Sequence, residues 1–236
     1  MYSPVKLGLK YIQYWLFAEN AKGHGVHSPF VFELIERVFN DDRNFYYFPL
    51  IESARESLTK STLTPQKYDH LFFRMVNYFG SSVVLELGTM LGITTSYLAA
   101  ANTNASVISL EKSTETATVA KRHFQYLGLK NIEQVIGEFD ETLPVVLSRI
   151  SQLDFVLVNG NYPKETTLHY FNQLKPHLHE NSVLIFVDIH RNKEMETVWR
   201  QVQSDEMVTL TIDLFFVGLV FFRKENKVKQ HFTVRY

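Results

Sequence analysis

The chain contains no cysteine among its 236 residues. This absence excludes disulfide bonds, thiolate metal sites and cysteine nucleophiles, and it fits the reducing cytoplasm in which we expect the protein to act. The first 20 residues also lack the unbroken apolar stretch of a signal peptide, because charged side chains such as Lys6 and Glu19 interrupt them. The sequence therefore gives no indication of export.

Long apolar runs and an excess of charge are also missing. The longest apolar run, 214–222, has about half of the ~20 residues that a membrane-spanning helix needs. Lys and Arg number 24 against 25 Asp and Glu, a formal net charge of −1. No overall field attracts the chain to nucleic acid or to an anionic membrane, so we expect neither as a partner. The apolar share of 45% is typical of a globular protein.

Aromatic residues are concentrated in the first 80 residues, which hold 17 of the 33 Phe, Trp and Tyr residues. Residues 11–16 have the spacing of an amphipathic helix. Ser28 before Pro29 predicts an N-cap, Thr64 before Pro65 predicts another, and Gly80 predicts a C-cap. We interpret residues 1–80 as a helical extension that caps a substrate or contacts a second copy. Packing within the monomer explains the aromatic residues equally well.

After Gly80 the pattern changes, and short apolar runs alternate with amphipathic ones. Continuously apolar strands separated by helices indicate a parallel sheet covered on both faces, in the α/β doubly wound class. We predict strands at 83–87, 106–110, 132–136, 155–158 and 183–187, and helices near 93–101, 114–127, 140–150, 164–175 and 192–203. The β-rich runs 208–214 and 217–222 are joined too closely for a helical crossover, so they predict an antiparallel hairpin. Residues 81–236 are thus expected to form one domain.

The first predicted strand ends in a glycine-containing turn, Glu-Leu-Gly-Thr-Met-Leu-Gly at residues 86–92, which opens a helix. An open α/β sheet binds its ligand at such a point. Met90 occupies the position of the second glycine of the dinucleotide pattern G-x-G-x-x-G, which disfavours a nicotinamide-dependent oxidoreductase. Glu86 would repel phosphate and attract an ammonium group. A turn from strand to helix also needs no ligand, so both readings remain open.

Two further strand ends carry polar residues. Glu111 lies 23 residues beyond Gly88, close to the ~20-residue interval at which an acidic side chain binds ribose hydroxyls. Glu138, Phe139 and Asp140 follow the third strand, where polar groups and an aromatic ring could contact a base. Asp140 as a plain helix N-cap is an equally good interpretation.

These residues resemble the class I S-adenosylmethionine-dependent methyltransferases, through ELGTMLG, the Glu111 strand end, GEFDETLP, DFVLVNG and the closing TIDLFFVGLVFF. The resemblance covers about residues 81–223. It is strongest to the small-molecule O-methyltransferases related to the catechol and caffeoyl-CoA enzymes, especially a bacterial subgroup whose N-terminal segment contains HGVHSPF. It implies a Rossmann-like, seven-stranded fold and S-adenosylmethionine as cofactor. The donor-binding residues that it implies are Glu86, Gly88, Thr89, Met90, Gly92, Thr94, Glu111, Lys112, Glu138, Phe139, Asp140 and Asn159.

The chain departs from this family at its metal and base positions. Catechol-type relatives bind a divalent metal with an acid after the fourth strand and an acidic pair after the fifth. Here those positions hold Asn159 and Asp188-Ile189, so we expect no tight Mg²⁺ site. Tyr162 occupies the place of the proton-accepting Lys or His, and a phenol with a pKa near ~10 is a poor base. His190 is the best remaining candidate base, with Asp188 and Tyr162 as the other candidate catalytic residues.

The leading hypothesis is a methyltransferase that acts on a small, hydroxylated or aromatic acceptor without an obligatory metal. The rival is a cofactor-binding pseudoenzyme that has lost turnover and acts through a partner, motivated by Asn159, Tyr162 and Ile189. His24 and His27 flank a glycine turn. With no third ligand nearby, a metal pair is disfavoured, and a lid or substrate wall stays open.

Overall fold

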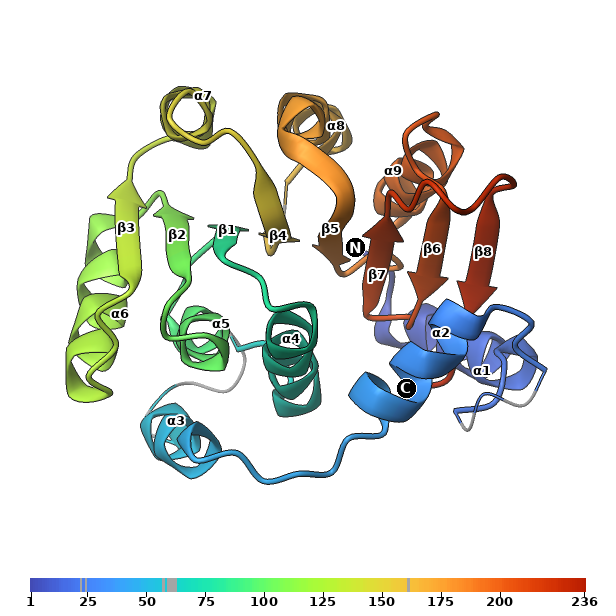
Figure 1. Cartoon of the computed structure of the whole chain (residues 1–236), viewed down its shortest axis with the longest axis horizontal. Coiled ribbons are helices and arrows are strands. Elements are labelled where there is room, and N and C mark those ends of the chain that lie inside the picture. Colours follow the sequence, from blue (N-terminus) through green and yellow to red (C-terminus); the bar gives the residue numbers. More distant parts are fainter. Residues whose placement is uncertain (22, 24, 57, 59–62, 161) are drawn as a thin grey trace. The chain divides into compact units, whose positions relative to one another are not determined.

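The computed structural model describes residues 1–21, 23, 25–56, 58, 63–160 and 162–236. The fold is α/β, with a mixed sheet of eight described strands (Figure 1). The chain divides into two compact units. The central unit is Asp41–Phe155, and the discontinuous unit combines Met1–Asn40 with Val156–Tyr236. The helices of residues 1–80 are divided between these two units.

The central unit contains three parallel strands in the order β3-β2-β1: β1 is Val83–Leu87, β2 is Ser106–Glu111 and β3 is Ile132–Ile136. Nearly all residues of β1 and β2 are buried, as their apolar sequences predict. The register pairs Glu86 with Ser109, which brings two polar side chains of neighbouring strands together. A fourth strand, β4 (Leu153–Val158), runs across the boundary between the units.

The helices of this unit flank the strands, with α4 and α5 on one side and α7 on the other (Figure 1). Gly80 ends α4 in the left-handed conformation, at φ 60°, which confirms the predicted C-cap. The predicted cap at Thr64 is wrong: the N-cap is Pro65, and no side chain caps that helix. The helix bounds are Tyr47–Glu56 (α3), Gln66–Phe79 (α4), Ile93–Ala101 (α5), Thr114–Tyr126 (α6) and Phe139–Leu147 (α7).

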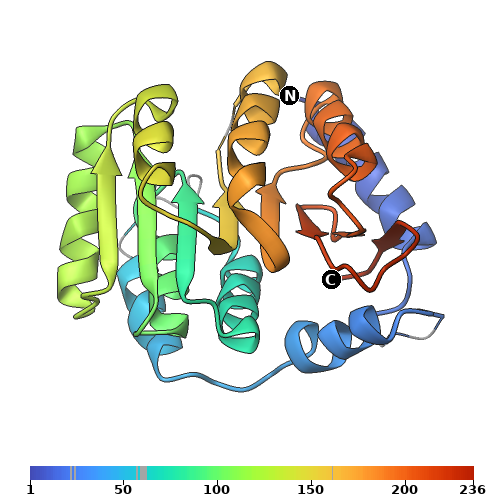
Figure 2. The ribbon, with the colours of Figure 1, turned by 45° about the horizontal axis from the view of Figure 1, so that its top comes forward.

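The discontinuous unit carries the antiparallel part of the sheet, in the order β5-β7-β6-β8 (Figure 1), and Figure 2 shows its C-terminal strands in red. Strand β7 is antiparallel to both β5 and β6, which confirms the predicted hairpin. Strand β8 is parallel to β6 and was not expected from the sequence. The strand bounds are Leu178–Val187 (β5), Leu210–Asp213 (β6), Val217–Phe221 (β7) and Gln230–Thr233 (β8).

The helix after Ser28 begins as its capping residues predict. The Ser28 hydroxyl accepts a hydrogen bond from the Val31 amide, and Pro29 is the first helical residue. No helix among the described residues combines the length and the apolar character needed to cross a membrane. The helix bounds are Pro4–Phe17 (α1), Pro29–Leu34 (α2), the π-helix Ile35–Phe39 (η1), Lys164–Leu174 (α8), the 3₁₀ turn Lys175–His177 (η3) and Lys193–Ser204 (α9).

Candidate functional site

The turn after β1 is held by backbone hydrogen bonds to the neighbouring strand. The amides of Gly88 and Thr89 donate to the Leu110 carbonyl at 2.9 and 3.1 Å. Gly88, Met90 and Gly92 all have positive φ angles, of 107°, 49° and 80°. Glycine adopts these angles without strain, but Met90 does not, and backbone strain of this kind often accompanies a binding site.

Glu86 lies beneath this turn and is completely buried. One carboxyl oxygen accepts hydrogen bonds from the hydroxyls of Thr95 and Ser109. The other, Oε1, is buried without a hydrogen-bond partner among the described residues. Burial raises the pKa of Glu86 to about 7, although the two hydroxyl hydrogen bonds oppose that shift. A buried acceptor oxygen with no donor is costly, and a ligand ammonium group would satisfy it.

Glu111, at the end of β2, closes the turn from the other side. Its two carboxylate oxygens accept hydrogen bonds from the backbone amides of Met90, at 2.7 Å, and Ser113, at 3.0 Å. Each oxygen keeps a second lone pair, so a vicinal diol could still bind to the same carboxylate. The backbone bonds fix its orientation toward the strand ends.

Thr94, in the first turn of α5, belongs to a buried polar network. Its hydroxyl donates to Asp69 Oδ1 at 2.7 Å. Asp69 is fully buried and also accepts a hydrogen bond from the Arg55 guanidinium. Burial raises the pKa of Asp69 to about 7, and the Arg55 charge opposes the shift. The Thr94 hydroxyl is thus committed to α4, so in this arrangement its backbone amide is the group left to hold a ligand carboxylate.

The residues after β3 are spread between the surface and the core. Lys112 forms an ion pair with Glu138 at 2.6 Å, and both side chains are largely exposed. Phe139 is only 2% exposed, so its ring packs in the core. Asp140 lies inside the first turn of α7, and the N-cap is Glu138, so the interpretation of Asp140 as the cap is wrong. Of these residues, the exposed Lys112–Glu138 ion pair is the group that can contact a ligand.

The other candidates belong to the discontinuous unit. Asn159 follows β4 and is 7% exposed. The ring of Tyr162 packs edge-on against Tyr170, with centroids 5.4 Å apart. Asp188 has a positive φ of 60°, and burial raises its pKa. Ile189 is fully buried, so its side chain offers nothing to a metal or a substrate.

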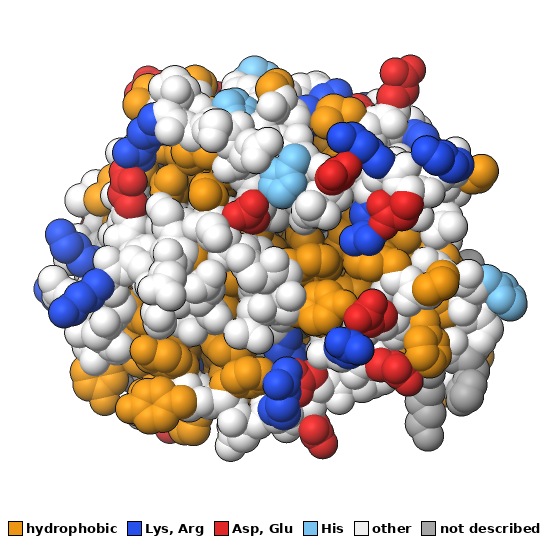
Figure 3. Space-filling model, in the orientation of Figure 1, with side chains coloured by type: hydrophobic (Ala, Val, Ile, Leu, Met, Phe, Trp, Pro, Cys, Tyr) orange, Lys and Arg blue, Asp and Glu red, His pale blue; other side chains and the backbone are white. Residues whose placement is uncertain are grey.

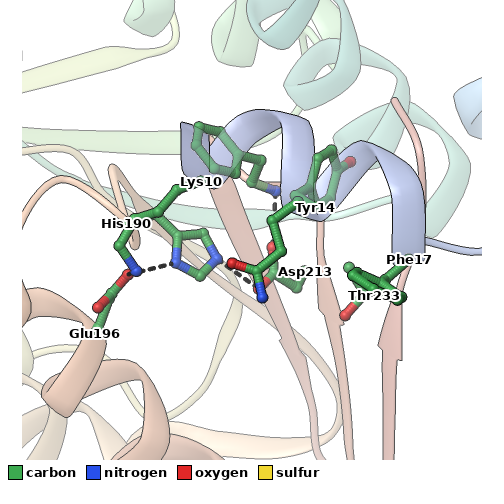
Figure 4. Close-up of a pocket in the computed structure, with 9 residues that line it drawn as sticks. Lys10, Tyr14, Phe17, His190, Glu196, Asp213 and Thr233 are labelled. Atoms are coloured by element: carbon green, nitrogen blue, oxygen red, sulfur yellow. Dashed lines mark hydrogen bonds and ion pairs between the residues drawn. The ribbon is translucent and has the colours of Figure 1, made fainter. Parts of the chain in front are cut away.

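His190 lies between two carboxylates that sequence reasoning missed (Figure 4). Its Nδ1 is 3.2 Å from Glu196 Oε1, and its Nε2 is 2.7 Å from Asp213 Oδ2. Burial lowers the pKa of His190, but the hydrogen bonds and charges of the two carboxylates outweigh it and raise the pKa above its ordinary value. An imidazolium that donates from both nitrogens has no lone pair, so this geometry does not favour a general base.

A cavity of about 390 Å³ opens beside His190. Its size is that of a pocket for a small organic molecule. One wall is α1, and the opposite wall contains aromatic and ionic side chains from the segments after β5 and around β6 (Figure 4). The lining residues are Lys10, Gln13, Tyr14, Phe17, His190, Glu196, Asp213, Phe215 and Thr233.

Among the residues that the structure describes, no three His, Asp or Glu side chains gather in a way that could hold a metal ion. His27 is exposed. His24 lies outside the described residues, so the predicted role of the His24 and His27 turn as a lid or wall stays a prediction.

Comparison with protein families matches residues 85–189 to the family described as "Methyltransferase domain". Residues 85–189 are a methyltransferase domain. The domain includes the candidates from Glu86 to Asp188, whereas His190 lies one residue beyond its end. The cavity residues of α1, α9 and β6 also lie outside it, so they belong to parts of the chain that the family match does not cover.

Solved structures share the fold of the methyltransferase domain over most of their length. The O-methyltransferase TomG from Streptomyces achromogenes, solved in complex with SAM, has a TM-score of 0.62 and 17% identity, covering 77% of this chain and 91% of its own. The SAH-bound methyltransferase PaMTH1 from Podospora anserina has a TM-score of 0.66 and 14% identity, covering 85% and 100%. An O-methyltransferase from Bacillus cereus in complex with SAH has a TM-score of 0.61 and 17% identity, covering 76% and 92%. No curated protein matches the chain. At these identities the likeness shows the fold.

Sequence reasoning found the glycine turn and the strand ends of the methyltransferase domain but missed their partners. Ser109 could have been noticed as a hydroxyl within an otherwise apolar strand. Nothing in the sequence marks Asp69, because it lies 25 residues from Thr94 on an ordinary amphipathic helix. Glu196 and Asp213 are 6 and 23 residues from His190 and carry no motif.

Proposed function

We propose that the protein is an S-adenosylmethionine-dependent O-methyltransferase that acts on a small, hydroxylated or aromatic acceptor without an obligatory metal. The observation that supports the donor most strongly is the unpartnered, fully buried Oε1 of Glu86 beneath the glycine turn. A ligand with an ammonium group would donate a hydrogen bond to this oxygen, and the methionine part of the donor has such a group. The SAM bound to TomG and the SAH bound to the O-methyltransferase from Bacillus cereus point to the same cofactor.

The residues of the turn fit this cofactor. Glu86 would bind the ammonium group, Glu111 the ribose hydroxyls, and the Lys112–Glu138 pair would border the base. Asn159 would face the sulfonium. When bound, the cofactor supplies a methyl group on a positively charged sulfur. The chain contributes by holding the acceptor in line with that methyl group and by excluding water.

The cavity beside His190 has the chemistry of a binding site for a small aromatic molecule. Its aromatic side chains, Tyr14, Phe17 and Phe215, suit a planar ring, while Gln13 and Thr233 can hydrogen-bond a hydroxyl group. The acceptor hydroxyl loses its proton as its oxygen bonds to the methyl carbon, and Asp188 and Tyr162 remain the candidate groups to receive it. Asp188 is the better of the two, because burial raises its pKa toward the range of a working base.

The same observations favour one second candidate, a cofactor-binding pseudoenzyme. His190 has both ring nitrogens engaged by carboxylates, and Tyr162 packs against Tyr170. The chain then offers few groups to accept the substrate proton. In that case the donor site would persist, and the protein would act through a partner.

The proposed partners follow the same evidence. On the face drawn in Figure 3, basic and acidic side chains of the described residues are interspersed, which is unlike the basic stripe of a nucleic-acid-binding surface. We propose a small-molecule acceptor, action in the cytoplasm and no nucleic-acid partner. Contact with a second copy through the N-terminal helices stays a prediction.

Thermal unfolding with and without S-adenosylmethionine tests the donor. A ligand at 100 times its dissociation constant stabilises the native state by ~2.7 kcal/mol, which raises the melting temperature by several degrees for a chain of this size. Adenosine triphosphate, which has phosphates where the donor has methionine, is the control ligand. No shift at millimolar donor would refute both candidate functions. Turnover of a panel of phenols, with EDTA and then with Mg²⁺, separates the enzyme from the pseudoenzyme and tests metal independence.

A further inference from the structure

Helix α1 buries little apolar surface, and its aromatic contacts centre on Tyr11 and Tyr14, whose rings pack against Phe215. Of its residues only Tyr14 is buried. The aliphatic side chains at positions 5, 9, 12 and 16 point outward and are 56 to 74% exposed. A helix with so little buried apolar surface has a low free energy of local opening. Polar contacts must therefore supply much of its attachment.

The polar contacts of the first half of α1 converge on one carboxylate, that of Glu196 in α9. The Tyr2 hydroxyl, just before the helix, donates to Glu196 Oε2 at 2.9 Å. The Lys10 ammonium lies 2.6 Å from Glu196 Oε1. The Tyr2 amide also donates to the carbonyl of Arg191, which follows His190 directly. The position of the first half of α1 thus depends on how Glu196 and the segment after β5 are held, while in the second half the Tyr14 hydroxyl donates to the Val234 carbonyl.

His190 holds both. Its Nδ1 contacts the same Glu196 oxygen that Lys10 contacts, and its Nε2 contacts Asp213 at the end of β6. The ring also stacks on Phe215, with centroids 5.2 Å apart at an angle of 26°. Lys10, Glu196, His190 and Asp213 therefore form a row of alternating charges when His190 is protonated. Loss of the His190 proton removes the cation beside Asp213 and one of the two cations beside Glu196, which weakens the row.

We propose that protonated His190 is a lock that holds α1 over the cavity, and that loss of its proton releases α1 and opens the cavity. A neutral imidazole donates from only one nitrogen, so either Asp213 or Glu196 loses its hydrogen bond from His190. Four of the nine lining residues of the cavity belong to α1, so movement of this helix changes access directly. His190 is then a positioning residue, and the lock does not depend on the proposed function.

The direction of the pH dependence follows from the groups around the ring. Facing His190 are Lys10 and Tyr14 from α1, Glu196 from α9, Asp213 from β6, and Asp188 and Arg191 from its own segment. The two contacting carboxylates raise the His190 pKa above its ordinary value. A histidine with a raised pKa in the folded state stabilises fully below its unfolded pKa of ~6.5, and this stabilisation is lost as pH rises through the folded pKa. The lock is closed at pH values below ~6.5 and opens as pH rises through the raised pKa of folded His190.

Trp15 on α1 reports the opening in the intact protein. It is 51% exposed with the Arg235 guanidinium 4.5 Å from its ring, whereas Trp199, the other tryptophan, is 4% exposed. Acrylamide quenching is therefore dominated by Trp15. We expect the quenching constant to rise, by at most about twofold because half the ring is already exposed, in a one-proton transition above pH ~6.5.

Two variants and one resonance make the test decisive. His190→Gln removes the transition and leaves Trp15 at the high quenching level at every pH, while the matched control His27→Gln, an exposed histidine of the same unit, keeps the wild-type curve. Should His190→Gln fail to fold, the His190 imidazole resonance of wild-type protein must titrate with the same midpoint as the quenching. The proposal is overturned by pH-independent quenching in wild type, by a transition that persists in His190→Gln, or by two different midpoints.

Discussion

Replacing Glu86 by Gln should make the protein more stable at alkaline pH and less able to bind its donor. The pKa of this fully buried carboxyl is raised from 4.5 to about 7, with burial as the main cause. Because the native state then binds more protons than the unfolded state between these values, stability falls as pH rises through this range. At 1.36 kcal/mol per pKa unit, keeping the charged form costs ~3 kcal/mol above pH 7.

Glutamine has nearly the same shape and no charge, so Glu86→Gln escapes this cost. Its carbonyl oxygen can accept the hydroxyls of Thr95 and Ser109, and its amide nitrogen replaces the unpartnered Oε1. An unsatisfied amide donor subtracts about 1–3 kcal/mol at every pH. This cost does not change with pH, so the prediction concerns how the free energy of unfolding varies with pH. Between pH 4.5 and 8 the free energy of unfolding of the variant should rise by ~3 kcal/mol relative to that of wild type.

Urea unfolding at half-unit pH steps measures that slope, and Glu206→Gln, at an exposed position on the surface, serves as the control. Calorimetric titration of S-adenosylmethionine should show weaker binding to Glu86→Gln, since a hydrogen bond to a charged group contributes about 1.5–3 kcal/mol. The reasoning is refuted if the stability difference between wild type and Glu86→Gln is the same at pH 5 and pH 8. Unchanged donor affinity would refute only the role of Glu86 as the ligand of the donor's ammonium group, and the stability argument would stand.

Three further substitutions test the central unit. Arg55→Met leaves the fully buried Asp69 carboxyl without its cation and should cost about 3–5 kcal/mol in urea unfolding, whereas the double change with Asp69→Asn recovers much of the loss. Gly92→Ala places a Cβ 2.7 Å from the Phe124 ring at a φ of +80°, which should lower the melting temperature by several degrees, while alanine at an exposed glycine with a negative φ should not. Glu111→Ala removes the acceptor of two backbone amides and should weaken donor binding at least tenfold, as measured by calorimetry. Urea unfolding of the same variant should show that the protein is still folded. Unchanged donor binding would contradict the assignment of Glu111 to the ribose.

The sequence predicted the strands well where they are buried on both faces. A run such as Val83–Leu87 can only be a strand between helices, and its bounds agree with the structure residue for residue. Strand β8 escaped prediction because Gln230–Thr233 is polar and only partly buried, so its pairing with β6 provides the signal that the sequence lacks. Helix α3 escaped because Pro49 and a run of aromatic residues obscure its periodicity.

The candidate site shows the same division between local and distant information. Gly88 and Gly92 could be found because left-handed turns demand glycine, and a turn is a local structure. The environment of a side chain is not local. His190 could be placed at a strand end, but the two carboxylates that raise its pKa come from α9 and β6 and carry no local signal. A titratable residue can be located from sequence, whereas its protonation state cannot.

The composition of α5 connects the fold to the proposed donor site. Every residue of Ile-Thr-Thr-Ser-Tyr-Leu-Ala-Ala-Ala is buried, because the helix contacts α3 and α4 as well as β2. Small residues are needed for such close packing, and the two threonines bring hydroxyls into it at positions that face other elements. Thr94 donates to Asp69 and Thr95 donates to Glu86, so consecutive residues anchor the helix to two buried carboxyls on different elements. The start of α5, whose amides carry the positive end of the helix dipole, is thereby fixed directly after the glycine turn. A change at Asp69, remote in sequence from that turn, should therefore disturb donor binding through the position of α5.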